Sequence, residues 1–328
     1  MPLVSFEPPA CDLRLLKTKN VPLRRTGHEN DDLWKHLGCF LPRIPQVAYL
    51  RECRSRACRD GLCGAVPREA RALVHAGVGR WPRKLLDECG GLNVTLVSIE
   101  SAAFYRSRRC PAVRATRDVA VPYPTHFRAA DEAELARHVE RVRAARRPRL
   151  ATHVAGLHRH GRSSGFRRLV HEQCVRDSRC DSIVHEGRLN LTDATILDAY
   201  ESSEFCLQPE GDTATRQAWF DAMLSGCVPV FFADCADFSR PLLFEHLYAP
   251  FLPPYFSRVG YGPGPWAVVL NASRVHVEPD YLVSSLAAVP PERRTAMRDT
   301  ILAFLPGLQY AEAKMPNDAA ALYRNLIS

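Results

Sequence analysis

The chain has 328 residues, of which 46% are hydrophobic, and its formal net charge is +8. This length can form two medium domains or one large one, and the sequence has no run of about 18 apolar residues that would predict a membrane span. Most basic residues are arginines without the interleaved aromatic residues that are typical of nucleic-acid binding, so nucleic acid is not an expected partner. The arginines fit either a solvated surface or an acidic ligand such as a nucleotide diphosphate.

The cysteines and the glycosylation sequons favour an oxidising, secretory compartment. The even count of 12 cysteines suits disulfides. Asn-x-Ser/Thr sequons begin at Asn93, Asn190 and Asn271. The opening residues, MPLVSFEPPACDLRLL, lack the basic start and the continuous apolar core of a signal peptide. The chain is therefore expected either to be cytosolic or to have a targeting segment that is absent from this version of the sequence. The cysteines favour the second alternative.

Composition and sequence patterns divide the chain into five predicted segments. Residues 1–70 are rich in Pro, Arg and Cys, and the spacing of Cys53, Cys58 and Cys63 favours disulfides over a zinc cluster. A Rossmann-like domain, whole or incomplete, is expected in residues 71–130, with strands near 92–99 and 117–124. The remaining segments are a helix over 131–147, in which acids precede bases, a second Rossmann-like domain over 148–312 and a tail over 313–328.

The second half of the chain alternates between strand and helix patterns. The predicted strands cover 150–155, 182–184, 205–207, 227–232, 268–270 and 275–277. The predicted helices cover 166–176, 194–200, 213–225, 238–244, 281–288 and 292–304. This alternation predicts an α/β fold with a parallel, doubly wound sheet.

Residues 205–230, FCLQPEGDTATRQAWFDAMLSGCVPV, read as strand, polar loop, helix and strand. The loop lies at the carboxyl end of its strand, where open α/β sheets bind ligands. Asp212 suits either the N-cap of the helix or a ligand-shaping loop. Thr213, Thr215 and Arg216 could surround a diphosphate at the first turn of the helix. Asp221 fits either a solvated helix residue or an acceptor for ribose hydroxyls.

A second strand-to-helix loop follows Gly156. Arg159 is the best candidate in it to neutralise a leaving diphosphate, although a surface arginine is the simpler interpretation. Arg167 and Arg168 open the next helix, where positive charge opposes the helix dipole and a bound anion would relieve the conflict.

Other chemistries fit this region poorly. The histidines near this loop do not have the spacing of a helical two-His metal site, so we expect no bound metal. The sequence GRSSG, centred on Ser163, has the form of a nucleophile elbow, but the polar stretch LHRH separates it from its strand. No dinucleotide-binding or P-loop fingerprint follows a strand.

Residues 205–232 resemble the core motif of the exostosin-like glycosyltransferases. Three further segments resemble that family in the same order: RDVAVPYP, AGLHRHGRSSGFRRLVHEQC, and the end, LVSSLAAVPPERRTAMRDTILAFLPGLQY. The resemblance covers about residues 80–312, whereas the Cys-rich residues before 80 depart from the family and leave its amino-terminal strands unrecognisable. It implies a GT-B fold, in which two Rossmann-like domains with parallel sheets face a cleft.

The implied function is transfer of a sugar, usually from a UDP-sugar, to a hydroxyl of a polysaccharide or glycoprotein glycan in the Golgi. The transfer would invert the sugar's anomeric centre and would need no metal or other cofactor. The implied partners are the nucleotide sugar, a glycan acceptor and another glycosyltransferase, with which the chain would form a homodimer or a heterodimer. The alternative is a catalytically inactive subunit that binds glycan or stabilises a partner transferase.

The resemblance also implies roles for individual residues. The second domain would hold the donor, and the first would face the acceptor. The donor-binding set carried over is Gly156, Arg159, Arg167, Gly211, Asp212, Thr213, Thr215, Arg216 and Asp221. Asp221 would lie near the ribose. An inverting transfer needs a general base for the acceptor hydroxyl, and His126 and Glu210 are the candidates.

Overall fold

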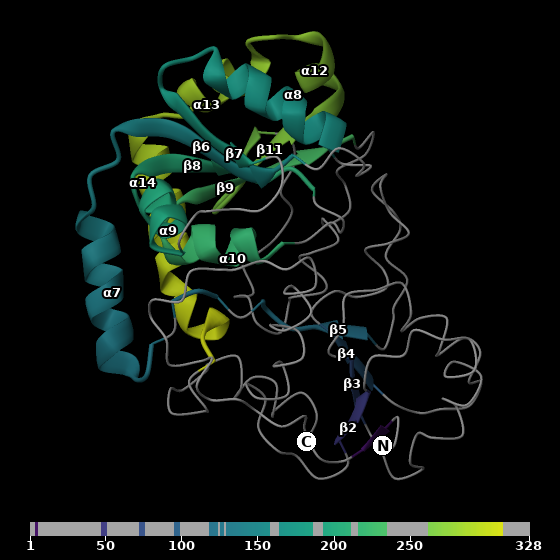
Figure 1. The fold of residues 1–328 in the computed structure, drawn as a ribbon. Coiled ribbons are helices and arrows are strands. Elements are labelled where there is room, and N and C mark those ends of the chain that lie inside the picture. Colours follow the sequence, from purple (N-terminus) through teal and green to yellow (C-terminus); the bar gives the residue numbers. More distant parts are fainter. Residues whose placement is uncertain are drawn as a thin grey trace, which may run out of the picture.

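The structure of the chain is a computed structural model. It describes residues 4–5, 47–50, 72–75, 95–98, 118–123, 125–127, 129–157, 164–185, 193–210, 216–234 and 262–310. The described strands form two sheets, one below the other in Figure 1. Within these ranges, no helix is long and apolar enough to cross a membrane.

The first sheet has the strand order β1-β2-β3-β4-β5. Its strands are β1 (Val4–Ser5), β2 (Val47–Leu50), β3 (Ala72–His75), β4 (Thr95–Ser98) and β5 (Asp118–Ala120). The strands β2 to β5 pair in parallel, and β1 pairs antiparallel with β2. The sheet therefore includes strands from the Pro- and Cys-rich region, where the sequence predicted none.

The second sheet has the order β10-β11-β9-β8-β6-β7 and is parallel except for β10. Its strands are β6 (Arg149–Gly156), β7 (Cys180–His185), β8 (Ser203–Leu207), β9 (Val228–Ala233), β10 (Gly262–Pro263) and β11 (Val268–Asn271). Two mainly parallel sheets confirm the predicted α/β fold. The predicted domain boundaries stay predictions.

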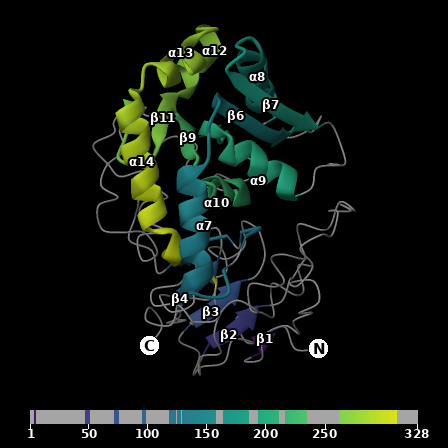
Figure 2. The same cartoon turned by 90° about the vertical axis from the view of Figure 1, so that its left-hand side faces the viewer.

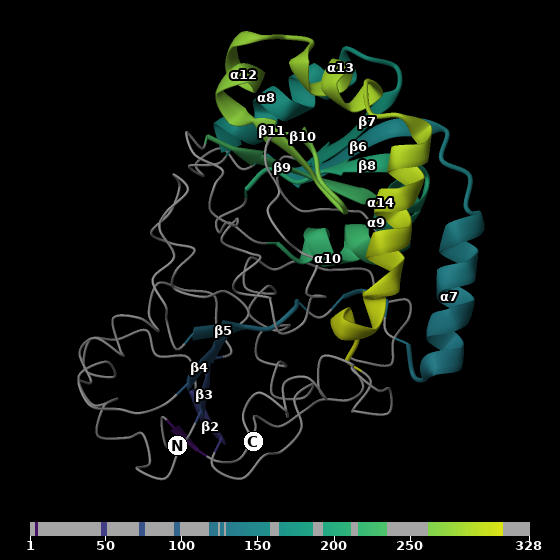
Figure 3. The same ribbon diagram turned by 180° about the vertical axis from the view of Figure 1, so that it is seen from behind.

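Helices cover both faces of the second sheet (Figures 1 and 3). One layer contains α8 (Ser164–Val175), α12 (Ala272–Val277) and α13 (Tyr281–Ala287). The other contains α9 (Asp193–Glu201), α10 (Gln217–Leu224) and α14 (Pro291–Ala303), which a 3₁₀ turn follows at Leu305–Leu308. Helix α7 (Glu132–Ala144) lies outside this layer beside α14 (Figure 2).

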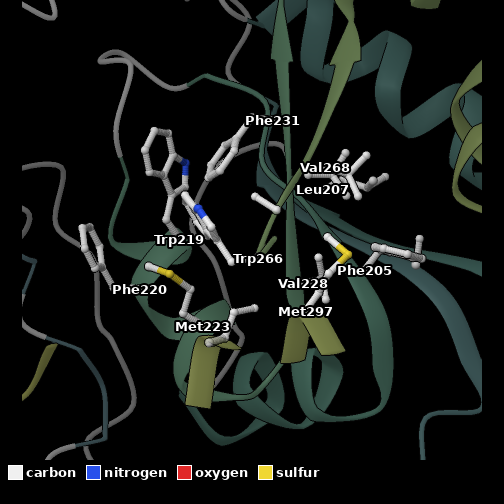
Figure 4. Packing of buried hydrophobic residues seen from close by; sticks show 14 of the residues in the cluster. Phe205, Leu207, Trp219, Phe220, Met223, Val228, Phe231, Trp266, Val268 and Met297 are labelled. Atoms are coloured by element: carbon white, nitrogen blue, oxygen red, sulfur yellow. The ribbon is translucent and has the colours of Figure 1, made fainter. Parts of the chain in front are cut away.

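The main hydrophobic core covers both faces of the second sheet, and a large part of it lies between the sheet and the layer of α10 and α14. Figure 4 shows Trp219 and Met223 of α10 meeting Phe231 of β9 and Trp266, with Met297 of α14 closing the cluster. All five side chains are buried. Burial of a large apolar side chain contributes about 1.5–3 kcal/mol, so this packing fixes α10 firmly against the sheet.

Two predicted elements are wrong. Residues 275–277, predicted as a strand, end helix α12, because Asn271 caps the helix by accepting a hydrogen bond from the Arg274 amide, and Arg274 pairs with Glu278 one turn later. Helix α10 begins at Gln217 and not near residue 213, so Asp212 is not its N-cap. The helix predicted at 238–244 lies outside the described residues.

The predicted disulfides are confirmed where the structure describes the cysteines. Cys174 bonds Cys180, and Cys206 of β8 bonds Cys227 just after α10. The second bond joins β8 to the turn between α10 and β9, so the loop motif and α10 lie between its two cysteines.

Candidate active site

The carboxyl ends of the adjacent parallel strands β6 and β8 define the candidate donor site. Gly156 ends β6, and Glu210 lies three residues beyond the end of β8. Ligands of open α/β sheets bind at this edge. Of the predicted donor residues that the structure describes, Gly156, Arg167 and Arg216 lie at this edge of the second sheet, whereas Asp221 lies within α10.

Two arginines connect these strand ends. The buried Arg167 of α8 donates from Nη1 to the Gly156 carbonyl and from Nε to the Glu210 carbonyl, both at 2.9 Å. Arg216 donates to the carbonyls of Pro209 at 3.2 Å and Val154 at 3.3 Å. Each guanidinium thus binds one carbonyl of β6 and one carbonyl of the segment after β8. These bonds hold the ends of the two strands in a fixed geometry.

Arg216 is also the N-cap residue of α10. Its backbone is extended, with φ −149° and ψ 146°, and no side chain caps the helix there. The first amides of a helix without a side-chain cap can donate to an anion, and the helix dipole favours negative charge at the same place. The position of Arg216 therefore suits contact with a diphosphate better than a position inside the helix would.

The environment of His153 reveals a positive field at this edge. Its ring is fully buried, with Nδ1 3.1 Å from the hydroxyl of Ser182. Burial lowers the pKa of His153 well below its usual value, and the nearby charges of Arg216 and Arg167 lower it further. His153 is therefore neutral at neutral pH and adds no positive charge beside the two arginines.

His126 and Asp221 form a hydrogen-bonded pair beside the start of α10. The Asp221 carboxylate accepts from the backbone amide of His126 at 3.0 Å, and its other oxygen lies 2.7 Å from His126 Nδ1. Asp221 is only 1% exposed. Gln217, one turn earlier on the same face of α10, places its amide nitrogen 3.4 Å from the same ring nitrogen. His126 and Asp221, to which the sequence assigned separate roles, are thus in direct contact.

The far end of α10 is held by basic side chains. His138 lies 2.9 Å from the carbonyl oxygen of Leu224, Arg147 donates to the Ser225 carbonyl at 2.8 Å, and Arg298 donates to the Gly226 carbonyl at 3.2 Å. Donors at a helix C-terminus satisfy its last carbonyls and complement its dipole. They also fix the helix that carries Asp221.

The other predicted residues divide into two groups. Glu210 is exposed directly after β8, in the same segment as Pro209. Arg159, Gly211, Asp212, Thr213 and Thr215 lie outside the described residues. Gln217 was missed, although its spacing of four residues from Asp221 places both on one helix face. In the described part of the chain, no three His, Cys, Asp or Glu side chains cluster as metal ligands.

Comparisons with known proteins identify relatives of this chain. Residues 96–241 match the Exostosin GT47 domain. The chain is 26% identical over 238 residues to the xyloglucan galactosyltransferase MUR3 of Arabidopsis thaliana, and this alignment covers 71% of this chain and 34% of MUR3. It is 31% identical over 202 residues to the xyloglucan galactosyltransferase XLT2 of the same plant, which covers 61% of this chain and 36% of XLT2.

A third relative is the xyloglucan-specific galacturonosyltransferase 1 of Arabidopsis thaliana, at 28% identity over 60% of this chain and 28% of that protein. The chain thus spans well under half the length of these relatives. Among solved structures, a crystal structure of S. aureus TarM with UDP aligns over 86% of this chain and 61% of that chain, with 8% identity and a TM-score of 0.38.

Proposed function

We propose that the chain transfers a sugar from a nucleotide sugar to a hydroxyl of a polysaccharide, because residues 96–241 match the Exostosin GT47 domain. Relatives named as galactosyl- and galacturonosyltransferases support a hexosyl donor, and their named acceptor, xyloglucan, supports a polysaccharide acceptor. We propose UDP as the nucleotide and the Golgi lumen as the compartment.

The observation that carries the proposal is the pair of arginines at the ends of β6 and β8. Arg167 and Arg216 bring two positive charges to the edge where α/β sheets bind nucleotides. Guanidinium groups suit diphosphates because their planar donors match the phosphate oxygens. In the proposed complex, Arg216 contacts the diphosphate and Arg167 holds the strand ends around it.

The remaining donor residues belong to the same proposal. Arg159 and the loop residues Gly211, Asp212, Thr213 and Thr215 would complete the diphosphate site, and Gly156 would let the ligand approach the backbone. The positive groups would stabilise the leaving diphosphate without a metal. The transfer would therefore proceed in the presence of a chelator. We also propose that it inverts the anomeric centre in a single displacement.

The experiment combines a thermal-shift screen with turnover. The purified chain is tested with UDP-galactose, UDP-galacturonate, UDP-glucuronate, UDP-xylose, UDP-arabinose and UDP-N-acetylglucosamine, and UDP release is then measured with xyloglucan and EDTA. A bound nucleotide at 100 times its Kd stabilises the fold by about 2.7 kcal/mol, which raises the melting temperature.

Arg216→Ala tests the site itself. Loss of a charge-assisted hydrogen bond costs about 1.5–3 kcal/mol, so donor affinity should fall by about 10- to 150-fold. Arg216→Lys should retain part of the affinity because it keeps the charge, and Arg137→Ala, which removes one exposed charge on α7, should bind normally. Normal donor binding by Arg216→Ala would refute the assignment.

The competing role is a non-catalytic subunit that binds glycan or stabilises a partner transferase, as a homodimer or heterodimer. Binding of xyloglucan without binding of any nucleotide sugar would favour that role. Nucleotide binding that is abolished by Arg216→Ala would favour the enzyme.

A further inference from the structure

We propose that His126 is the general base of the transfer and that Asp221 is the positioning residue that holds its ring in the reactive form. This inference rests on the proposed function and adds to it the group that activates the acceptor. The starting observation is that one oxygen of the buried Asp221 carboxylate accepts from the His126 backbone amide and the other lies 2.7 Å from the ring nitrogen Nδ1.

The hydrogen bond to Asp221 determines where the ring can take up a proton. An ionised carboxylate only accepts hydrogen bonds, so His126 Nδ1, 2.7 Å from the Asp221 oxygen, must carry a hydrogen. In the neutral ring the basic lone pair then lies on Nε2. The other carboxylate oxygen of Asp221, Oδ1, accepts a hydrogen bond from the His126 backbone amide. The carboxylate therefore fixes the orientation of the ring as well as its tautomer.

The proposed step balances with the acceptor and donor alone. Nε2 of His126 takes the proton of the acceptor hydroxyl while that oxygen forms a bond to C1 of the donor sugar. The bond between C1 and the diphosphate oxygen breaks, and its electron pair leaves with the nucleoside diphosphate. Asp221 remains ionised and stabilises the imidazolium that forms, as the carboxylate of a serine-protease triad does.

The segment that contains His126 is fixed to the second sheet's helices. The ring of Tyr123 stacks on Phe220 of α10 with centroids 5.6 Å apart, and the Tyr310 hydroxyl donates to the Pro122 carbonyl at 2.6 Å. His126 itself binds α10. The base is therefore positioned on the same helix whose N-cap, Arg216, belongs to the proposed diphosphate site, so base and leaving group share one rigid support.

This arrangement competes with the role that the family resemblance implies for Asp221. A carboxylate that contacts the ribose would contribute to donor binding, whereas a carboxylate that orients His126 would contribute to turnover. The two roles differ in the kinetic parameter that they change, so substitution of Asp221 distinguishes them.

The experiment compares His126→Gln, Asp221→Asn and the double variant in the full chain. We expect kcat for transfer to fall by about 10²- to 10⁴-fold in each single variant, with the donor Kd within about threefold of the wild type. The double variant should lose no more than His126→Gln alone, because Asp221 acts through His126. Asp198→Asn on α9, where the carboxylate is exposed, is the matched control and should keep full turnover.

Two further measurements separate catalysis from folding. His126→Ala should regain transfer when imidazole is added, which a purely structural loss would not allow. The acid limb of the pH–kcat profile should disappear in His126→Gln.

Several results would overturn the inference. These are additive losses in the double variant, a donor Kd that rises as far as kcat falls in Asp221→Asn, no imidazole rescue, or loss of the acid limb in Glu210→Gln instead. If the wild-type chain transfers sugar and the His126 variants transfer it equally fast, the assignment of His126 as the general base is refuted and the proposed function is not. A wild-type chain that transfers no sugar from any donor refutes the proposed function, and the base with it.

Discussion

The carboxylate of Asp221 binds both the backbone and the ring of His126, although the two residues are 95 positions apart in the sequence. The pair joins the segment after β5 to helix α10. Its geometry therefore depends on whatever holds α10 in place, and the supports of that helix can be tested one at a time.

Arg147 is the support with the most hydrogen bonds. It donates to the carbonyls of Tyr200, Ser203, Val142 and Ser225. Burial lowers its pKa to about 10, so it remains charged at neutral pH. Arg147→Met should lower the free energy of unfolding by about 3–5 kcal/mol in urea titrations, since carbonyls deprived of their donor cost about 1–3 kcal/mol each.

Two controls accompany that variant. Arg147→Lys should rescue little, because an ammonium cannot span four carbonyls as the planar guanidinium does. The neighbouring exposed Arg146→Met should change stability by less than about 0.5 kcal/mol. Equal effects at both positions would show that Arg147 is not a specific support.

Gly226 ends the turn after α10 with a φ of +62°. A Cβ at this position would lie 2.6 Å from Val142 Cγ1 and 3.0 Å from Arg147 Nη2. Gly226→Ala should therefore destabilise the fold by about 2–5 kcal/mol, which combines left-handed backbone strain with a steric clash. In the same urea titration, Gly165→Ala on α8, with open space around its Cβ, should be neutral or stabilising by up to about 1 kcal/mol.

The two described disulfides should contribute unequally. Cys206–Cys227 closes a sequence separation of 21 residues, and Cys174–Cys180 closes one of 6. Loop-closure entropy predicts that replacement of the longer pair by alanines costs about 3 kcal/mol and that replacement of the shorter pair costs about 2 kcal/mol. Denaturant unfolding under oxidising conditions measures both, and a larger loss for the shorter loop would contradict this explanation.

Acid should destabilise the fold through its buried histidines. Burial lowers the pKa values of His153 and His138, so below pH about 6.5 the unfolded chain binds protons that the folded chain does not. The free energy of unfolding should thus fall as pH falls from 7 to 5, by up to about 1.4 kcal/mol per pH unit for one fully shifted histidine.

His153→Asn should make that pH dependence shallower, and His276→Asn on the exposed face of α12 should leave it unchanged. The measurement is chemical denaturation at a series of pH values. An identical slope in wild type and His153→Asn would show that His153 titrates normally in the folded chain.

Local patterns were sufficient to predict most of the second sheet. The strand over 150–155 and the helix over 131–147 are confirmed as β6 and α7. The mostly apolar strand segment that ends at a glycine and the Asp131 cap with acids at the helix start are signals that nearby residues supply. Strand β2 is an apolar segment of only four residues in a Pro- and Cys-rich region, too short to identify from its sequence, and it pairs in parallel with β3.

The candidate site was predicted residue by residue but not as pairs. The loop motif pointed to Arg216, and the position after β5 pointed to His126, yet no periodicity relates residues 95 positions apart. The start of α10 was misplaced because the extended backbone of Arg216 is set by its bonds to the Pro209 and Val154 carbonyls, which are tertiary contacts.

The most direct test of sugar transfer at this site is a time course by proton NMR with an α-linked UDP-hexose and a xyloglucan acceptor. The wild-type chain should form a β-linked product together with an equal amount of UDP, and Arg216→Ala and His126→Gln should form it far more slowly. An α-linked initial product, or UDP release with only free sugar at undiminished rate in both variants, would contradict an inverting transfer by Arg216 and the His126–Asp221 pair.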